Sequence, residues 1–287
     1  MDDDIRELGP DAFPPLLAEI PEPPARLWLR GSLPSPERAW LTVVGTRAYT
    51  PYGKQAVEHL IAGLAGAPVV IVSGLALGID ALAHEAALRA GIPTVAIPGS
   101  GLEWRVLYPR TNVSLARRII AAGGAHLSEY EPGFRAQKWS FLRRNRLMAG
   151  IAHATLIIEA AEKSGTLVTA RLAADYNRDV LAVPGSIFSE TSKGVHRYLR
   201  HGATPIGSAA DILDALGIDA QPAIPLAHAE GLDPSEARVL AILREPLPRD
   251  ELIRALGMSA ADAGALLSRL ELAGLLAEDA GMIRALR

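Results

Sequence analysis

The sequence contains no cysteine among its 287 residues. Disulfide bonds, thiolate zinc sites, iron–sulfur clusters and cysteine nucleophiles are therefore excluded. No run reaches the roughly 18 uninterrupted apolar residues that a transmembrane helix needs, since the apolar stretch 151–161 is broken by His153 and Glu159. Residues 1–4 are acidic where a signal peptide would be basic. We therefore expect a cytoplasmic protein without a membrane span.

The composition is that of an ordinary globular protein. Hydrophobic residues make up 49% and charged residues 21% of the chain, which allows a sizeable core and excludes disordered, collagen-like and coiled-coil chains. The formal net charge is −3, but it is unevenly distributed. Nine basic residues outnumber three acidic ones over 103–146, whereas nine acidic residues outnumber seven basic ones over 233–287. A polyanion is therefore expected to bind the middle of the chain.

Short apolar runs alternate with helical stretches from about residue 40 onward. The runs are rich in Val and Ile and show little alternation, which is typical of parallel strands covered on both faces. We predict strands at 41–45, 69–73, 94–97, 126–128, 155–159 and 180–183, and helices at 51–65, 79–90, 112–122, 141–149, 167–177, 194–201 and 209–216. This alternation predicts an α/β fold with a doubly wound, mainly parallel sheet.

The rest of the chain divides into three further segments. Residues 1–38 are rich in proline, with a helical signal at 13–20 and an edge strand at 27–31, and we expect an N-terminal extension that packs on the core domain, 39–216. Residues 217–231 carry Pro222 and Pro225 and are predicted to be a linker. Residues 232–287 begin with a capping sequence at Asp233. Helices at 234–244, 249–256 and 259–273 and a hairpin at 275–283 predict a small winged-helix domain.

The ends of the predicted strands are rich in small residues. We call these positions the strand-end rim: Gly45, Thr46 and Arg47; Ser73 and Gly74; Gly99; Ser164, Gly165 and Thr166; Gly185 and Ser186. Small residues let backbone N–H groups approach an anion, and helix N-termini add a favourable dipole. Tight turns between strands and helices also use glycine for conformational reasons alone. Because the small residues recur at five strand ends, the pattern favours a phosphate-binding rim.

The densest chemical signal lies in residues 137–146. Four cations, two aromatic residues and two amides fall within these ten positions, and no acidic residue lies between Glu131 and Glu159. Rings interleaved with cations suit single-stranded nucleic acid, because the rings stack on bases and the cations follow phosphates. The alternative is a solvated basic helix with Trp139 and Phe141 in the core. Removing Arg47 or Arg144 is expected to leave the fold intact, since a rim cation contributes little to stability.

Familiar catalytic and cofactor motifs are absent from the sequence. It has no P-loop, no complete dinucleotide fingerprint after Gly99, and no metal-ligand spacing among its seven His residues. We therefore expect no metal and no cofactor. Glu159 could be a general base or could bind loop N–H groups and shape the rim, and the sequence does not separate these two roles. His84 is expected to pack or to cap a helix.

At these residues the chain closely resembles the DNA-processing protein A family (DprA, also called Smf). The resemblance covers about residues 11–287. It rests on Val44-Gly45-Thr46-Arg47, Ser73-Gly74-Leu75-Ala76, Gly78-Ile79-Asp80, Ala83-His84, Tyr108-Pro109-Arg110-Thr111-Asn112, Ser128-Glu129-Tyr130, residues 141–146, Glu159-Ala160, Ser164-Gly165-Thr166 and Pro184-Gly185-Ser186. The C-terminal segment is similar to the variable winged-helix domain of the same family.

The resemblance implies an extended Rossmann-like fold and a cytoplasmic, non-enzymatic protein. Such proteins bind and protect incoming single-stranded DNA during natural transformation, help to load the RecA recombinase on it, and usually form homodimers through the Rossmann-like domain. The residues implied at the DNA site are Arg47, Lys138, Arg144 and Arg146 as phosphate contacts, Phe141 as a stacking ring, Asn145 as a polar contact, and Ser164, Gly165 and Thr166 as an anion-binding turn shaped by Glu159.

Two positions depart from the family pattern, and two other functions compete. Leu142 lies where family members usually have proline, and we expect this change to let the helix begin earlier. His196 lies where asparagine is common in the family.

An enzyme that hydrolyses nucleoside phosphates is one rival function, because related folds do so. A transcriptional regulator is the other, but the third helix of the winged helix offers only Arg269 against two acidic residues, so we expect an interaction module that does not read sequence.

Overall fold

The computed structural model describes residues 4–218, 233–243, 247–272, 275–279 and 282–285. The chain divides into two compact units, Met1–Gln221 and Pro222–Arg287, which we describe separately. Most of the predicted linker, 219–231, lies outside the described residues.

The first unit is built on one mixed sheet in the order β1-β2-β6-β5-β4-β3-β7-β8-β9. Its strands are β1 (Ile5–Leu8), β2 (Leu27–Gly31), β3 (Ala39–Val44), β4 (Val69–Ser73), β5 (Thr94–Ala96), β6 (Ala125–Ser128), β7 (Ala154–Ile157), β8 (Asp179–Ala182) and β9 (Thr204–Pro205). Pairing is parallel from β6 to β9 and antiparallel where β2 joins β1 and β6. The predicted α/β class and mainly parallel, Rossmann-like sheet are confirmed.

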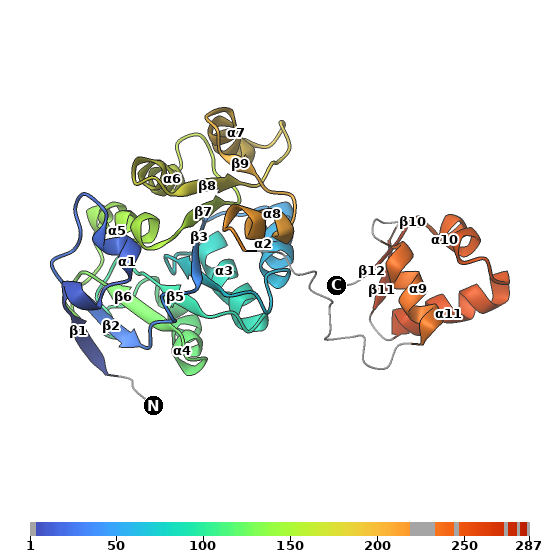
Figure 1. Cartoon of the computed structure of the whole chain (residues 1–287), viewed down its shortest axis with the longest axis horizontal. Helices are drawn as coiled ribbons and strands as arrows, with labels where there is room; N and C mark the ends of the chain where they lie inside the picture. The colour runs from blue at the N-terminus through green and yellow to red at the C-terminus, as the bar shows by residue number, and fades with distance from the viewer. Residues whose placement is uncertain (1–3, 219–232, 244–246, 273–274, 280–281, 286–287) are drawn as a thin grey trace. The chain divides into compact units, whose positions relative to one another are not determined.

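Helices cover both faces of this sheet. They are α1 (Pro15–Ala18), α2 (Pro51–Ala62), α3 (Ile79–Arg89), α4 (Val113–Ala121), α5 (Lys138–Ile151), α6 (Thr166–Asp175), α7 (Lys193–Arg200) and α8 (Ala209–Ala215). Short 3-10 turns lie at η1 (Pro10–Ala12), η2 (Arg110–Asn112) and η3 (Glu190–Ser192). Figure 1 shows α1 beside α5 and α2 beside α3.

Alternate side chains of the central strands enter two different cores. Val70 and Val72 pack with residues of α5, whereas Val69 and Ile71 pack with residues of α2 and α3. All four side chains are fully buried, and each such burial contributes about 1.5–3 kcal/mol relative to exposure. Burial on both faces explains why the strands read as continuous apolar runs.

Helix α5 begins three residues before its predicted start at Phe141. Ser140 Oγ accepts a hydrogen bond from the Gln137 N–H at 3.0 Å, which satisfies a backbone donor at the helix start in the manner of a capping box. Leu142 lies in the second turn and keeps the backbone N–H that proline lacks. The early start puts Lys138 and Trp139 on the first turn of α5.

The second unit is a winged helix, as predicted. It contains α9 (Pro234–Ile242), β10 (Leu247–Pro248), α10 (Arg249–Leu256), α11 (Ala260–Leu272), β11 (Leu276–Asp279) and β12 (Met282–Ala285). The strands form an antiparallel sheet in the order β10-β12-β11. Asp233 caps α9 by accepting the Ser235 N–H at 2.7 Å and the Glu236 N–H at 3.1 Å.

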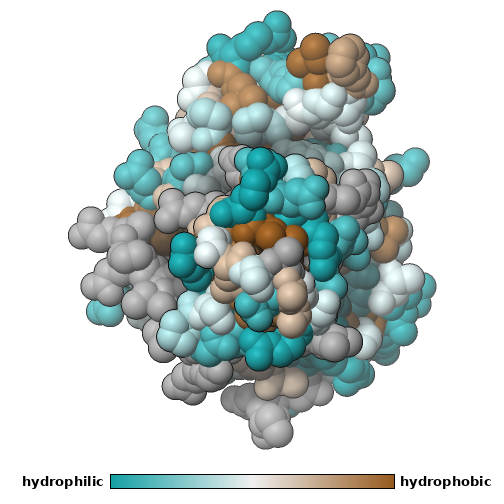
Figure 2. All heavy atoms as spheres, turned by 90° about the vertical axis from the view of Figure 1, so that its right-hand side faces the viewer, coloured by the Kyte–Doolittle hydropathy of each residue, from teal (hydrophilic) through white to brown (hydrophobic). Residues whose placement is uncertain are grey.

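Large apolar side chains reach the surface at several places in the first unit. Phe188 is 90% exposed and Ile187 is 75% exposed, in the loop between β8 and η3. Figure 2 shows brown side chains at the top of its view, the end at which Figure 1 places α7. Among the described residues, no helix is both long and apolar enough to cross a membrane.

Candidate nucleic-acid interface

The strand order reverses between β3 and β7, and ligands of doubly wound sheets bind at the carboxyl ends of such strands. Two hydrogen bonds join the loops that leave this point. The Thr166 hydroxyl donates to the Gly45 carbonyl at 2.9 Å, and the Thr46 N–H donates to the Glu159 carbonyl at 2.8 Å. The predicted turn from Ser164 to Thr166 therefore lies against the start of the β3–α2 loop, with Gly165 exposed.

Arg47 and Phe141 meet at this end of the sheet. The Arg47 guanidinium carbon lies 5.8 Å from the centroid of the half-buried Phe141 ring. The Tyr108 ring lies 5.6 Å from the Phe141 ring at an interplanar angle of 56°. Gly99 lies beneath, where a Cβ atom would come within 2.5 Å of the Phe141 ring. The structure thus brings together a cation, two rings and a glycine from four separate segments.

Tyr108 is not among the predicted site residues. It is 49% exposed and precedes Pro109 in the loop that leads to η2. Its position after β5 indicates a strand-end loop, but only the path of that loop brings the ring to Phe141.

Arg144 lies beneath the rim and is only 4% exposed. Its guanidinium donates to the Gly74 carbonyl at 2.7 Å and to the Ile97 carbonyl, so it ties the ends of β4 and β5 together. Asn145 Oδ1 accepts from Arg144 Nε at 3.3 Å. Burial lowers the pKa of Arg144 to about 10, although Asp80 nearby acts in the opposite direction.

Asp80 completes this buried layer. One of its carboxylate oxygens accepts the Gly74 N–H at 3.1 Å and the Ala76 N–H at 3.4 Å. Burial raises the pKa of Asp80, and the positive charge of Arg144 opposes that rise. Arg144 and Asp80 are therefore opposite charges buried in the same layer, and each holds the start of the β4–α3 loop through its own hydrogen bonds to the backbone. Arg144 is a buried residue in this arrangement, in contrast to the solvent-facing rim cation that the sequence suggested.

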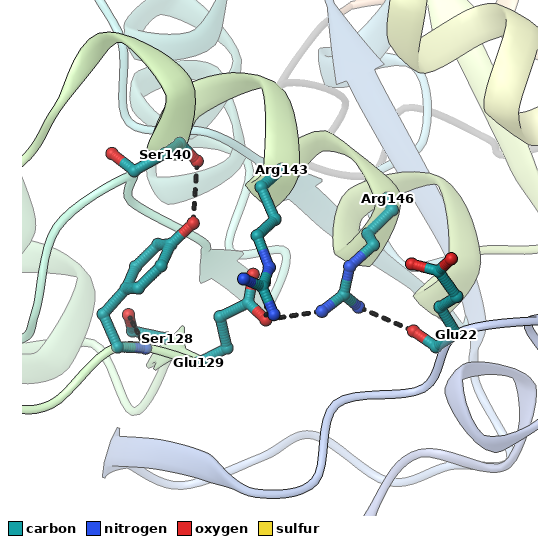
Figure 3. Close-up of polar contacts among 7 residues, drawn as sticks. Glu22, Ser128, Glu129, Ser140, Arg143 and Arg146 are labelled. Atoms are coloured by element: carbon teal, nitrogen blue, oxygen red, sulfur yellow. Dashed lines mark hydrogen bonds and ion pairs between the residues drawn. The ribbon is translucent and has the colours of Figure 1, made fainter.

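Arg146 is directed away from the rim. Its guanidinium pairs with Glu129 and donates to the Glu22 carbonyl at 2.9 Å, as Figure 3 shows. Arg143 Nε lies 3.5 Å from the same Glu129 carboxylate. Glu129 precedes the acid-free interval 132–158 in the sequence. The path of the chain between β6 and α5 nevertheless places its carboxylate beside the arginines of α5. Arg146 thus fastens the N-terminal extension to the core.

The Glu159 carboxylate is buried and fully engaged. One oxygen accepts the Thr50 hydroxyl at 2.6 Å and the Thr191 hydroxyl at 3.0 Å, and the other accepts the Thr50 N–H at 2.9 Å. Gly53 leaves room for it, because a Cβ atom there would lie 2.2 Å from the carboxylate. These contacts hold the N-terminus of α2 against η3, and they favour the pocket-shaping role over that of a general base.

The remaining predicted rim residues differ in accessibility. The Ser73 hydroxyl is buried and donates to the Val43 carbonyl at 2.7 Å. Gly185 and Ser186 lie in the β8–η3 loop, where the Gly185 carbonyl is 3.0 Å from His196 Nε2. Lys138 is exposed, and it forms no ion pair with any residue in the described part of the chain. The Arg47 side chain is exposed as well.

The described residues contain no group of three or more His, Cys, Asp or Glu residues that could hold a metal ion. In the second unit, the exposed cation of α11 is paired internally. Arg269 lies 3.5 Å from Asp233 and 3.7 Å from Glu236. This pairing agrees with the expectation that the third helix does not read a DNA groove.

The fold and the rim define a Rossmann-like α/β protein with an appended winged-helix unit. A family model described as DNA recombination-mediator protein A matches residues 5–217, and one described as the DprA winged helix domain matches residues 222–282. The chain belongs to the DNA recombination-mediator protein A family, DprA/Smf.

Relatives and solved structures agree with this membership. The DNA processing protein DprA of Streptococcus pneumoniae is 42% identical over 205 residues, which are 71% of each chain. The protein Smf of Synechocystis is 33% identical over 313 aligned positions, covering 94% of this chain and 77% of the other.

Two solved structures of relatives have the same fold. The X-ray structure of the pneumococcal protein superposes with a TM-score of 0.68 at 37% identity, covering 74% of both chains. DNA processing protein A of Helicobacter pylori superposes with a TM-score of 0.65 at 32% identity, covering 75% of this chain and 98% of the other. The latter is described as having a unique single-stranded DNA binding mode.

Proposed function

We propose that this protein binds single-stranded DNA at the strand-end rim and acts as a recombination mediator. The observation that carries the proposal is the meeting of Arg47 with the Phe141 and Tyr108 rings at the carboxyl ends of the strands. A ring accepts a base by stacking, and adjacent cations follow the phosphates without regard to sequence. Family membership and the described single-strand binding of the H. pylori relative support it.

The accessible residues take the direct contacts in this proposal. Arg47 and Lys138 contact phosphates, Phe141 stacks on a base, and the turn formed by Ser164, Gly165 and Thr166 at the start of α6 receives a further phosphate. The buried residues act indirectly. Arg144 and Asn145 position the loops that present Phe141, and Arg146 holds the N-terminal extension. Small side chains on the rim let the DNA backbone come close to the ends of the β-strands, and they are those of Gly45, Thr46, Gly74 and Gly99. Gly185 and Ser186 lie at the far end of the rim.

The mediator role completes the proposal. In the cytoplasm the protein binds incoming single-stranded DNA, protects it, and helps to load RecA on it during natural transformation. It does so without catalysis and without a cofactor. The engagement of both Glu159 oxygens supports binding as the mode of action. The test is the onset of RecA ATPase activity on single-stranded DNA that is already covered by single-strand binding protein. A shortened lag is expected, and an unchanged lag would contradict RecA loading.

We propose that two copies associate through the Rossmann-like unit. Ile187 and Phe188 support this, because two adjacent apolar side chains this exposed are costly to leave in water. Light scattering of the full chain is expected to give twice the monomer mass, and Phe188→Ser is expected to lower it. A monomeric wild-type protein at micromolar concentration would contradict this part of the proposal.

DNA binding is tested by fluorescence anisotropy with labelled oligo-dT, an equally long duplex as competitor, and a salt series. We expect preference for the single strand, a steep salt dependence and little preference among sequences. Equal or weaker binding to the single strand than to the duplex would overturn the proposal. The rim would then be tested as a site for nucleoside phosphates.

A further inference from the structure

A second group of aromatic rings lies beside the start of α5. Trp139 makes edge-on contacts with Tyr130 and Phe134, with ring centroids 5.8 Å apart in both cases. Tyr130 and Phe134 stack on each other at 4.6 Å. Phe141, two positions further along the helix, contacts Tyr108. Because side chains two positions apart in an α-helix point in directions about 160° apart, the two aromatic groups flank the first turn of α5 on opposite sides.

Trp139 is exposed, but its surroundings hold it in place. Its side chain is 52% exposed, whereas Tyr130 is 8% exposed. The Tyr130 hydroxyl donates to the Ser140 carbonyl at 3.1 Å, the contact drawn at the left of Figure 3. The backbone of Phe134 is anchored on both sides, because its N–H donates to the Glu131 carbonyl and its carbonyl accepts the Gly101 N–H, each at 2.9 Å. An indole supported in this way loses little conformational freedom when a flat ligand stacks on it.

Three basic residues lie near Trp139 in the chain. Lys138 precedes it, and Arg143 lies one turn further along the same helix face, with 58% of its side chain exposed. Arg135 is exposed in the loop before the helix. Lys138 and Arg135 form no ion pair with any residue that the structure describes. Leu142, 54% exposed and three positions after Trp139, widens the apolar surface. An exposed ring with two such cations, Lys138 and Arg135, near it in the chain is complementary to a base with its flanking phosphates.

We propose that Trp139, backed by Tyr130 and Phe134, is a second base-stacking platform for single-stranded DNA. A strand that stacks one base on Phe141 passes over the first turn of α5, where Lys138 contacts its backbone, and stacks a later base on Trp139. This inference rests on the proposed function, which supplies the strand and its position at Phe141. It adds a prediction that the rim alone does not make: short oligonucleotides reach one platform, and longer ones reach both.

Tryptophan emission reports directly on this contact. The chain has four tryptophans. Trp40 is 2% exposed, and Trp28 and Trp104 are partly buried, so Trp139 is the one whose indole is more than half exposed. Titration of the full-length protein with oligo-dT of about 12 nucleotides, within the range of site sizes for single-strand binders, is expected to quench its emission. Trp139→Phe should bind the same oligonucleotide by anisotropy but lose most of the quenching.

Affinity as a function of oligonucleotide length provides the second measurement. Trp139→Ala is expected to weaken binding of the longer oligonucleotide about tenfold, the scale of one lost stacking contact. It should leave binding of an oligonucleotide of about three nucleotides unchanged, because that length fills one platform. Phe141→Ala should weaken both. Met282→Ala, which removes an exposed apolar side chain from the second unit, is the matched control and should change neither.

The outcomes separate this inference from the proposed function. Unchanged emission together with unchanged affinity of Trp139→Ala for the longer oligonucleotide would overturn the platform while leaving single-strand binding intact. Absence of binding by the wild-type protein would overturn both. Thermal melting of each variant is included, and Trp139→Phe keeps the test valid if Trp139→Ala is poorly folded.

Discussion

The Arg47 guanidinium carbon lies 5.8 Å from the centroid of the Phe141 ring, although strands β4, β5 and β6 lie between the two residues in the sequence. Arg47 follows the central strand β3, and Phe141 lies on α5, which precedes the neighbouring strand β7. The reversal of strand order at β3 and β7 is what brings them together. A positive charge and a stacking surface therefore act on the same nucleotide in the proposed site.

Removing the Arg47 charge should weaken DNA binding without harming the fold. Arg47→Ala is expected to lose about 1–3 kcal/mol of binding free energy, the scale of a charge-assisted contact. The salt dependence should become less steep, because one fewer phosphate is neutralised. Anisotropy titrations across a salt series measure both effects. Arg89→Ala, which removes an exposed cation on α3, is the control, and an equal loss in both variants would mean that the effect is not local.

Removing the Phe141 ring should separate stacking from core packing. Phe141→Ala is expected to lose about 1–3 kcal/mol of binding free energy if the ring stacks on a base. Because the ring is only half-buried, the free energy of unfolding should change less than the 3–5 kcal/mol typical of a fully buried phenylalanine. Binding titrations and urea denaturation of the same preparation give the two numbers. A large loss of stability with unchanged affinity would assign the ring to the core.

Removing Arg144 should destabilise the protein. Arg144→Met leaves the Gly74 and Ile97 carbonyls without their donor and removes the larger of the two positive charges, Arg144 and Arg47, that act on the buried Asp80 carboxylate. Leaving a buried charge uncompensated costs about 3–5 kcal/mol. Urea denaturation measures the loss. The double variant Arg144→Met with Asp80→Asn removes both charges and should recover part of it. Wild-type stability in the single variant would show that Arg144 is not the buried support that its contacts indicate.

The parallel core was predictable because its signal is local. Strands β3, β4 and β7 are rich in apolar residues and fully or almost fully buried, with one buried threonine in β3 (Thr42) and one in β7 (Thr155). Burial on both faces gives this pattern without any strand partner having to be identified in advance. The small residues after each strand were predictable for the same reason. Strand β1 was not predicted because none of its four side chains is buried, and β9 was not predicted because it has only two residues.

The arginines of α5 show where sequence reasoning fails. Adjacent positions in one basic run have unrelated surroundings, because Arg143 is exposed, Arg144 contacts the ends of two strands, and Arg146 contacts a segment more than 100 residues earlier in the chain. None of these partners is three or four residues away in the sequence, the spacing at which side chains of one helix contact each other. A basic run therefore predicts a nucleic-acid surface, but tertiary packing decides which of its cations face that surface.

His84 provides a prediction about acid stability. Its side chain is fully buried, and Nδ1 lies 2.7 Å from Thr94 Oγ1. The Thr94 hydroxyl in turn lies 2.9 Å from the Ile71 carbonyl, to which it donates. Burial lowers the pKa of His84 to about 3, whereas in the unfolded chain it is about 6.5. The folded protein therefore keeps this imidazole neutral at pH values where the unfolded chain takes up a proton.

The consequence is a loss of stability on the acid side. The contribution of the neutral His84 is fully present above about pH 6.5 and falls as the pH drops toward 3, by about 1.4 kcal/mol per pH unit inside that window. His84→Gln removes the titration, so the stability advantage of the wild type over this variant should shrink by about 1–2 kcal/mol between pH 7.5 and pH 5. Urea denaturation at several pH values measures the difference, with His59→Gln, at an exposed position of α2, as the control. A group contributes to the pH dependence of stability only when its pKa changes on folding. If the free energies of unfolding of the wild type and His84→Gln differ by the same amount at both pH values, the pKa of His84 is therefore the same in the folded and unfolded chains, which would contradict the prediction.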